Sequence, residues 1–289
     1  MQPQSAEHLP GEPEPKLKIY FLPNLLTAGN LFCGFVALTK IVEADFERAN
    51  YYDQITVALG FILLACIFDL FDGRVARMGG VDSPFGREFD SLADIISFGA
   101  APAFLVHKVV LRDAFGGSHA EFGWFIASIY LICGAFRLAR FNCLAAMPNA
   151  LTGKEFLGFP IPSAAALVSS LTLLIVQLNK NDKTIPAWVE YFLVVVLLFL
   201  SAMMVSTVKY PSFKSLGMRS KSTFTKVLIF AIFLGFILLL REKILYYVLP
   251  AFFTLYLLYG FVRPRISHRM LREIEEEEEE ESHPLGTDD

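Results

Sequence analysis

The sequence predicts an all-α, polytopic integral membrane protein with about eight transmembrane helices. Two observations lead to this fold class. Of the 289 residues, 54% are hydrophobic, 28 are Phe and the mean hydropathy is +0.49, which is too apolar for a soluble domain. Long apolar runs also recur along the chain, and most approach the roughly 20 residues that a helix needs to cross a bilayer.

The runs give the expected helices and domains. The helices are 22–42, 55–71, 89–110, 122–141, 161–178, 188–208, 224–240 and 244–262. Residues 16–265 are expected to form one transmembrane domain. Residues 1–15 are polar, Pro-rich and acidic, unlike a signal peptide, and they read as a disordered leader. Residues 266–289 read as a disordered acidic tail.

The charges exclude some partners and suggest an orientation. The net charge of −4 comes from the glutamate run 275–281, and the rest of the chain is mildly basic, so no nucleic-acid partner is implied. Seventeen of the 25 Lys and Arg residues fall in alternate connections on one side, which the positive-inside rule makes cytoplasmic. Both termini would then be cytoplasmic. The other side has Arg48, Lys108, Arg112, Lys180, Lys183, Arg241 and Lys243, with Lys40 ending the first helix.

The most informative stretch reads DLFDGRVARMGGVDSPFGREFDSLAD and lies between two apolar runs. Asp69 and Asp72 are three residues apart and Asp90 and Asp94 are four apart, so each pair shares one face of a helix. The spacing describes two helix ends facing each other across a pocket. Gly86, one turn before Asp90, would allow another helix or a ligand to approach closely.

Four carboxylates at the edge of hydrocarbon repel one another and are costly to desolvate, so they either take up protons or hold cations. Oxygen ligands of this kind suit Mg²⁺, Mn²⁺ or Ca²⁺. Arg77, one turn beyond Asp72, adds a planar donor fork suited to phosphate. Any one of these side chains alone could be a solvated group of an interfacial loop, but the array predicts a metal-bridged phosphoryl group.

Two further groups of polar residues have alternative readings. Asn24, Thr27, Asn30 and Gly34 form a stripe on the first helix that serves either helix packing or contact with a ligand. Arg137 and Arg140 share a helical face on the side of the carboxylates, with Asn142 just beyond. Such arginines either anchor the helix end at the membrane interface or bind phosphate or carboxylate.

The pattern DxxDGxxARx8GxxxDxxxD resembles the signature of the CDP-alcohol phosphatidyltransferase family, and this chain matches every signature position. The resemblance extends over about residues 20–170. The element PNLLTxxNLxxG, and FRLARFN followed by GxPxP, are similar to the branch of the family that uses serine as acceptor. The resemblance implies a six-helix catalytic core and a homodimer in the cell (inner) membrane, with the active site at the cytoplasmic face.

The resemblance also implies roles for residues. CDP-diacylglycerol would bind with its diphosphate across two divalent ions, Mg²⁺ or Mn²⁺, held by Asp69, Asp72 and Asp90, with Asp94 joining one ion. Asp94 would also remove the proton of the serine hydroxyl, giving phosphatidylserine and CMP. The residues implied to contact CDP-diacylglycerol are Asn24, Thr27, Gly73, Ala76, Arg77, Ser83 and Gly86. Those implied to contact L-serine are Arg137, Arg140 and Asn142.

Three other functions stay open on the sequence. The acceptor could be glycerol 3-phosphate, inositol phosphate or choline. Intramembrane carboxylates also occur in ion and proton transporters, although these place them near the bilayer midplane in inverted repeats, and no repeat is visible here. A non-catalytic scaffold would bind CDP-diacylglycerol among the membrane lipids without turning it over.

Overall fold

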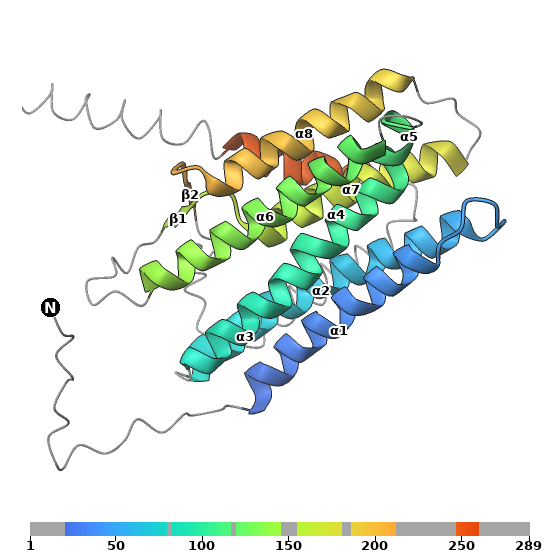
Figure 1. Cartoon of the computed structure of the whole chain (residues 1–289). Helices are drawn as coiled ribbons and strands as arrows, with labels where there is room; N and C mark the ends of the chain where they lie inside the picture. The colour runs from blue at the N-terminus through green and yellow to red at the C-terminus, as the bar shows by residue number, and fades with distance from the viewer. Residues whose placement is uncertain are drawn as a thin grey trace, which may run out of the picture.

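Among the residues that the structure describes, six helices are long and apolar enough to cross a membrane, and they form the body of the bundle. A computed structural model describes residues 21–79, 83–116, 120–145, 155–180, 186–211 and 247–259. The six spans are Phe21–Glu43, Tyr51–Val75, Pro84–Leu111, Glu121–Ala145, Ile161–Lys180 and Trp188–Val205. They lie side by side as one elongated bundle (Figure 1). The chain is therefore a polytopic membrane protein, as its composition predicts.

The helices keep the order that the sequence predicts. They are α1 (Phe21–Glu43), α2 (Tyr51–Gly79), α6 (Ala120–Ala145), α7 (Ile161–Lys180) and α8 (Ala187–Val205). The third span is built from four joined segments, and a fifth, α5, continues it beyond Leu111. Those segments are α3 (Pro84–Asp94), η1 (Ile95–Ala100), α4 (Ala101–Val106), η2 (His107–Leu111) and α5 (Arg112–Ala114). Of the two remaining expected helices, 224–240 lies outside the described residues. The other contains the described helical stretch Tyr247–Tyr259, and its remaining residues lie outside the part of the chain that the structure describes.

The second and third helices include more residues of the signature (69–94) than the hydropathy predicts. The prediction ends the second helix at residue 71, but α2 continues to Gly79, so Gly73, Ala76 and Arg77 all have helical backbone. The third helix begins at Pro84 rather than near residue 89, because Ser83 caps it. The Ser83 hydroxyl accepts a hydrogen bond from the Gly86 backbone N–H at 3.0 Å, and proline is well suited to the first helical position.

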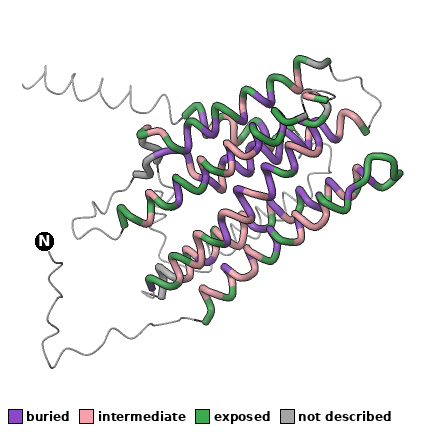
Figure 2. Tube along the Cα trace, in the orientation of Figure 1, coloured by how far each residue is buried: buried purple, intermediate pink, exposed green. Residues whose placement is uncertain are grey.

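The third span is the centre of the bundle. In its most apolar stretch 72% of the residues are buried, against 28–33% in α1, α2 and α6. It contacts α1, α6 and α7, while α1 packs along α2. Figure 2 shows buried residues concentrated along this central helix. The outer helices instead expose large apolar side chains that suit contact with lipid tails, including Phe32, Phe35, Phe136 and Trp188.

A close contact between α1 and the central span fixes the geometry near the carboxylates. Immediately after Asp94 the helix widens into the π-helical segment η1, where the Tyr130 hydroxyl donates to the Phe98 carbonyl at 3.1 Å. The Ser97 hydroxyl donates across to the Asn30 carbonyl at 3.0 Å. Gly34 permits this approach, since a Cβ there would lie 2.8 Å from the Ser97 Cα.

One small sheet adds to the expected all-α fold. Strands β1 (Glu155–Leu157) and β2 (Lys209–Pro211) pair antiparallel, with Phe156 opposite Tyr210. Gly158 follows β1 with a φ of +79°, a conformation that favours glycine. The Phe159 N–H then donates to the Met203 carbonyl at 3.0 Å, which ties the start of α7 to the end of α8.

Candidate active site

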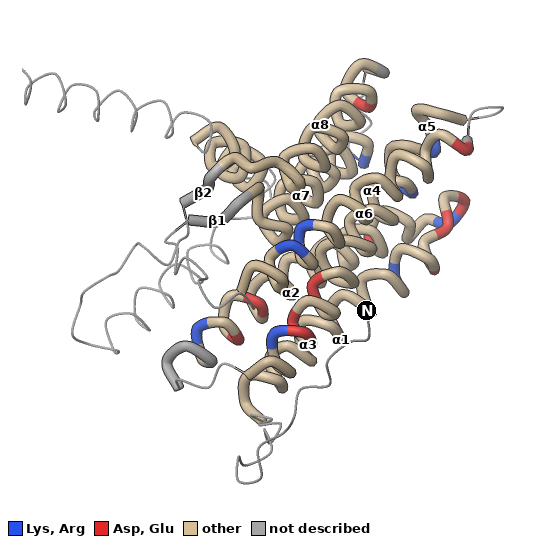
Figure 3. The backbone as a smooth tube through the Cα atoms, turned by 60° about the vertical axis from the view of Figure 1, so that its left-hand side comes forward, with Lys and Arg blue, Asp and Glu red and all other residues tan. Residues whose placement is uncertain are grey.

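Three carboxylates from two helices converge near one end of the bundle. Asp69 and Asp72 come from α2 and Asp90 comes from α3. One oxygen of each lies within 4.8 Å of the others, as a shared cation would require. We call these three residues the acidic cage. Figure 3 shows the acidic positions of α2 and α3 in the same part of the bundle. The structure thus brings Asp90 together with Asp72 and Asp69, which lie 18 and 21 positions earlier in the sequence.

The chemistry of the acidic cage fits a divalent cation. Asp72 is only 4% exposed, and Asp69 and Asp90 are half-buried. One oxygen of Asp90 is buried without a hydrogen-bond partner among the described residues. Buried carboxylates at such close range repel one another unless a proton or a cation offsets their charge. Three such oxygens are hard ligands, so the acidic cage could hold Mg²⁺ or Mn²⁺.

Helix α1 supplies a polar wall for the carboxylates. The Thr27 hydroxyl lies 3.0 Å from a carboxylate oxygen of Asp72, and the Asn30 amide donates to Asp94 at 3.1 Å. Thr27 is 3% exposed and Asn30 is fully buried. The side-chain oxygen of Asn30 has no partner among the described residues. The polar stripe on the first helix therefore packs against the central span and contacts the acidic residues, and its contact with a ligand stays a prediction.

Asp94 lies beside the acidic cage rather than in it. Its carboxyl is 5% exposed and close enough to Asp69, Asp90 and Asp72 for their charges to interact. Asp94 is not among the three aspartates whose oxygens lie within 4.8 Å of one another, and its expected role as a ligand of one ion stays a prediction. The Asn30 amide is hydrogen-bonded to one oxygen of Asp94, which orients the carboxyl group.

The other residues expected near the nucleotide fall into two groups. Asn24, Ser83 and Gly86 lie together at the start of α3, where a Cβ on Gly86 would be 3.4 Å from the Asn24 side-chain oxygen. The Asn24 amide nitrogen is buried without a partner among the described residues. Gly73 is half-buried on α2. The side chains of Ala76 and Arg77 lie outside the described part of the chain.

The two arginines of α6 have different surroundings. Arg140 donates to three backbone carbonyls at the end of α8, those of Val205 at 2.7 Å, Ser206 at 3.1 Å and Met204 at 3.2 Å. These bonds satisfy carbonyls that a helix end leaves unpaired. Its guanidinium therefore joins α6 to α8.

Arg137 instead faces the carboxylates. It is 7% exposed, and its charge interacts with those of Asp94 and Asp69. Its Nε–H is buried with no hydrogen-bond partner among the described residues. A buried donor without a partner costs about 1–3 kcal/mol. This donor is therefore available to an anionic group that enters the site.

Two further residues, Asn142 and Tyr256, lie beside the arginines and helices of the site. Asn142 lies within α6, and its amide donates to the Ser91 hydroxyl at 3.0 Å and to Glu88 at 3.2 Å, joining α6 to α3. Tyr256, on the helix Tyr247–Tyr259, interacts electrostatically with Arg137.

The sequence did not point to Tyr256, because the distal helices contain no diagnostic motif. Asn30 was noted only as part of a stripe, although the spacing of three from Thr27 was a usable signal.

The site therefore combines acidic oxygens suited to a cation with a buried donor suited to an anion, near one end of a membrane bundle. Comparison with known proteins gives its class. Residues 20–201 match the family model described as CDP-alcohol phosphatidyltransferase. The chain belongs to this family, which confirms the resemblance seen in the signature, and it is an enzyme of that family.

Several relatives carry more specific names. A CDP-diacylglycerol–serine O-phosphatidyltransferase of Helicobacter pylori (strain ATCC 700392 / 26695) is 35% identical over 245 residues, covering 85% of this chain and 91% of that protein. One of Bacillus subtilis (strain 168) is 32% identical, covering 67% and 92%. The archaetidylserine synthase of Methanothermobacter thermautotrophicus is 30% identical, covering 68% and 72%.

Proposed function

We propose that this enzyme transfers the phosphatidyl group of CDP-diacylglycerol to the hydroxyl of L-serine, giving phosphatidylserine and CMP. The observation that carries the proposal is the pairing of the acidic cage with Arg137, whose buried Nε–H has no partner among the described residues. The names of the relatives from Helicobacter pylori and Bacillus subtilis support serine as the acceptor.

The carboxylates have separate roles in this proposal. Asp69, Asp72 and Asp90 would hold divalent cations, which offset the charge of the diphosphate and of the leaving CMP. Asp94 would accept the proton of the serine hydroxyl as its oxygen attacks the phosphorus of the phosphatidyl group and the bond to CMP breaks. Asn30 would hold the Asp94 carboxyl in position for that transfer.

Of the two arginines, Arg137 is the better candidate to bind the serine carboxylate. The guanidinium of Arg140 is engaged by carbonyls of α8, whereas that of Arg137 lies against the acidic side of the site. A charge-assisted hydrogen bond from Arg137 would hold the acceptor near Asp94. Asn142 would act less directly, by keeping α6 against α3.

The test is CMP release by the purified full-length protein in lipid. We expect release that requires CDP-diacylglycerol, L-serine and Mg²⁺ or Mn²⁺, and that stops when a chelator removes the metal. Glycerol 3-phosphate, inositol phosphate and choline, offered in place of serine, should give little product. Faster release with one of these alcohols would overturn serine as the acceptor, and binding without turnover would indicate a scaffold.

A further inference from the structure

A distal helix packs against the hydrophobic core of the bundle. It is the stretch Tyr247–Tyr259, which lies beyond residue 201, where the match to the family model ends. Pro250 and Leu257 are buried, and Phe253 and Tyr256 are half-buried against the core. Steps of three and four residues place these side chains on one face of the helix. This face therefore docks the distal helix on the bundle.

Tyr256 of this helix contacts a residue that backbone hydrogen bonds hold in place. Its ring centre lies 5.7 Å from that of Phe159, with the two ring planes at 40°. Phe159 is fully buried, and its backbone N–H donates to the Met203 carbonyl at 3.0 Å. The N–H of the preceding residue, Gly158, donates to the Val208 carbonyl at 2.9 Å. Phe159 is thus fixed just before α7, and the ring of Tyr256 packs on this fixed position.

Arg137 lies beside the same part of the bundle. On α6, Gly134 is one turn before Arg137, and a Cβ on Gly134 would lie 2.7 Å from the Cδ1 atom of Ile161. Helix α6 therefore contacts the start of α7 two residues after Phe159. The charge of Arg137 also acts on the Tyr256 side chain. The guanidinium and the phenol ring thus lie together beside the start of α7.

The two contacts of Tyr256 join two segments that stand out in the sequence. Arg137 belongs to the segment FRLARFN, and Phe159 belongs to the segment GFPIP. The proposed function uses Arg137 but gives the segment GFPIP no role. Through Tyr256 this segment gains one, because Phe159 holds the ring whose hydroxyl lies on the side of the guanidinium.

The chemistry of Tyr256 and Arg137 suits a positioning contact. A guanidinium has five N–H donors in one plane, and the buried Nε–H of Arg137 has no partner among the described residues. A phenol oxygen can accept a hydrogen bond from one part of that plane and leave the rest to a ligand. A side chain that is already held in its binding rotamer loses less conformational entropy when the ligand arrives.

We propose that Tyr256 is a positioning residue, which holds the Arg137 guanidinium in the orientation that binds the carboxylate of the acceptor. This role rests on the proposed function, in which Arg137 binds that carboxylate. It makes the distal helix, outside the region that the family model matches, a determinant of the affinity for the acceptor.

The test is steady-state kinetics of CMP release by the full-length Tyr256→Phe variant in lipid. Phe keeps the ring contact with Phe159 and removes only the hydroxyl, so the variant should fold. We expect KM for serine to rise about three- to ten-fold, while kcat and KM for CDP-diacylglycerol stay within about two-fold of the wild type. An unchanged KM for serine, or a fall in kcat alone, would overturn the role.

A second substitution separates positioning from direct contact with serine. If Tyr256 acts through Arg137, its hydroxyl has less to position once lysine replaces the arginine. Tyr256→Phe should therefore change KM for serine by less than about two-fold in the Arg137→Lys background. The same rise in both backgrounds would overturn the role, because Tyr256 would then act on serine independently of Arg137.

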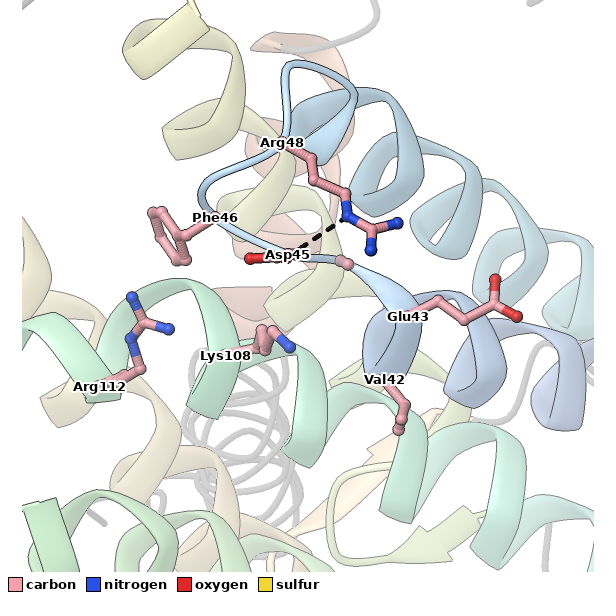
Figure 4. Close-up of a pocket in the computed structure, with 8 residues that line it drawn as sticks. Val42, Glu43, Asp45, Phe46, Arg48, Lys108 and Arg112 are labelled. Atoms are coloured by element: carbon pink, nitrogen blue, oxygen red, sulfur yellow. Dashed lines mark ion pairs between the residues drawn. The ribbon is translucent and has the colours of Figure 1, made fainter.

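Two controls make similar changes elsewhere. Tyr259→Phe removes a hydroxyl from the same helix at a residue that is 53% exposed, and wild-type kinetics are expected. Phe46→Leu removes a ring from another arginine, since the Arg112 guanidinium carbon lies 4.2 Å from the Phe46 ring centre. Phe46 and Arg112 line a second charged cavity, about 330 Å³ in volume, where the connection between α1 and α2 meets the end of the central span (Figure 4). Phe46→Leu should lower the melting temperature and leave KM for serine unchanged. A rise in KM for serine in either control equal to that in Tyr256→Phe would overturn the role.

A failure of the proposed function gives a different result. If CMP release by the wild type depends on glycerol 3-phosphate or inositol phosphate instead of serine, the acceptor is wrong, and KM for that alcohol decides the role of Tyr256. If no such anionic alcohol supports release, melting temperatures decide it. Tyr256→Phe should then lower the melting temperature less in Arg137→Lys than in otherwise wild-type protein, and equal losses would overturn the contact between the two side chains.

Discussion

At the scale of single residues, the carboxylates divide into the three of the acidic cage and Asp94. We predict that Asp69→Asn, Asp72→Asn or Asp90→Asn each abolishes CMP release, because each change removes a charge that a cation needs, while the protein still inserts and folds. Asp94→Asn should retain substantial binding of CDP-diacylglycerol but lose transfer. Turnover and binding of the nucleotide lipid by the purified variants check both statements. Near-normal turnover of a cage variant at low metal would contradict the metal role.

Asn30 is predicted to act through Asp94. Asn30→Ala removes the hydrogen bond that orients the Asp94 carboxyl, so kcat should fall about ten-fold or more while KM for CDP-diacylglycerol changes little. The control is Thr39→Ala on the same helix, since the exposed Thr39 hydroxyl donates to the Phe35 carbonyl of its own helix and to no other group among the described residues. A change confined to KM, with kcat preserved, would contradict a positioning role.

The two arginines of α6 should respond differently to the same substitution. Arg137→Lys keeps the charge but loses the planar fork, and we predict a rise of about ten-fold or more in KM for serine, with a smaller change for CDP-diacylglycerol. Arg140→Lys should mainly lower the melting temperature, because it weakens three bonds to the end of α8. Steady-state kinetics with each substrate varied in turn separate the two results. Unchanged serine kinetics in Arg137→Lys would leave this arginine as an anchor of the helix end.

The sequence predicts those features of the site whose residues are close together in the chain. It does not predict contacts between residues far apart in the chain. The aspartates could be grouped from spacing alone, because each pair shares one helix and a face. The division of labour between Arg137 and Arg140 could not be predicted. The partners of Arg140 are backbone carbonyls 64–66 residues further along the chain, and any residue type presents such a carbonyl.

At the scale of elements, the contact between α1 and η1 keeps Asn30 of α1 next to Asp94 of the site. We predict that Gly34→Ala lowers both the melting temperature and the activity. The added Cβ would collide with Ser97 and push α1 away from the central span, breaking the bonds that Ser97 and Asn30 make. Gly60→Ala on α2 is the control, because a Cβ there meets nothing within 4 Å. Equal melting temperatures for the two variants would show that the contact tolerates a methyl group.

The order of the helices could be predicted from hydropathy, but the ends of the helices and the small sheet could not. Apolar composition stops at residue 71, whereas the helix α2 continues to Gly79 through the more polar sequence that follows. The strands β1 and β2 have three residues each and lie about 50 positions apart. Such short strands have no pattern of their own and form only because α7 and α8 bring them together.

At the scale of the whole molecule, the fold places two charged regions at opposite ends of one bundle. The central span carries Asp90 and Asp94 near its start and Lys108 near its end, and Arg112 follows directly after it. Asp90 and Lys108 are 18 residues apart, or about 27 Å along a helix, so these two charged regions are separated by nearly the thickness of the hydrocarbon core. Composition predicted the bundle, but the second cavity depends on a connection whose fold the sequence did not reveal.

Because the two ends of the bundle can be labelled separately, the orientation of the protein in the membrane can be tested. The distribution of basic residues predicts that the acidic cage faces the cytoplasm, where serine is available. Cys143 is an exposed free thiol near the end of α6 on the cage side, and Asn50 is exposed in the connection at the other end. With the other native cysteines replaced, a membrane-impermeant thiol reagent should label Asn50→Cys in intact cells and Cys143 only after permeabilisation. The reverse pattern would place the acidic cage outside the cell, away from cytoplasmic serine, and the proposed transfer could not use the cytoplasmic pool.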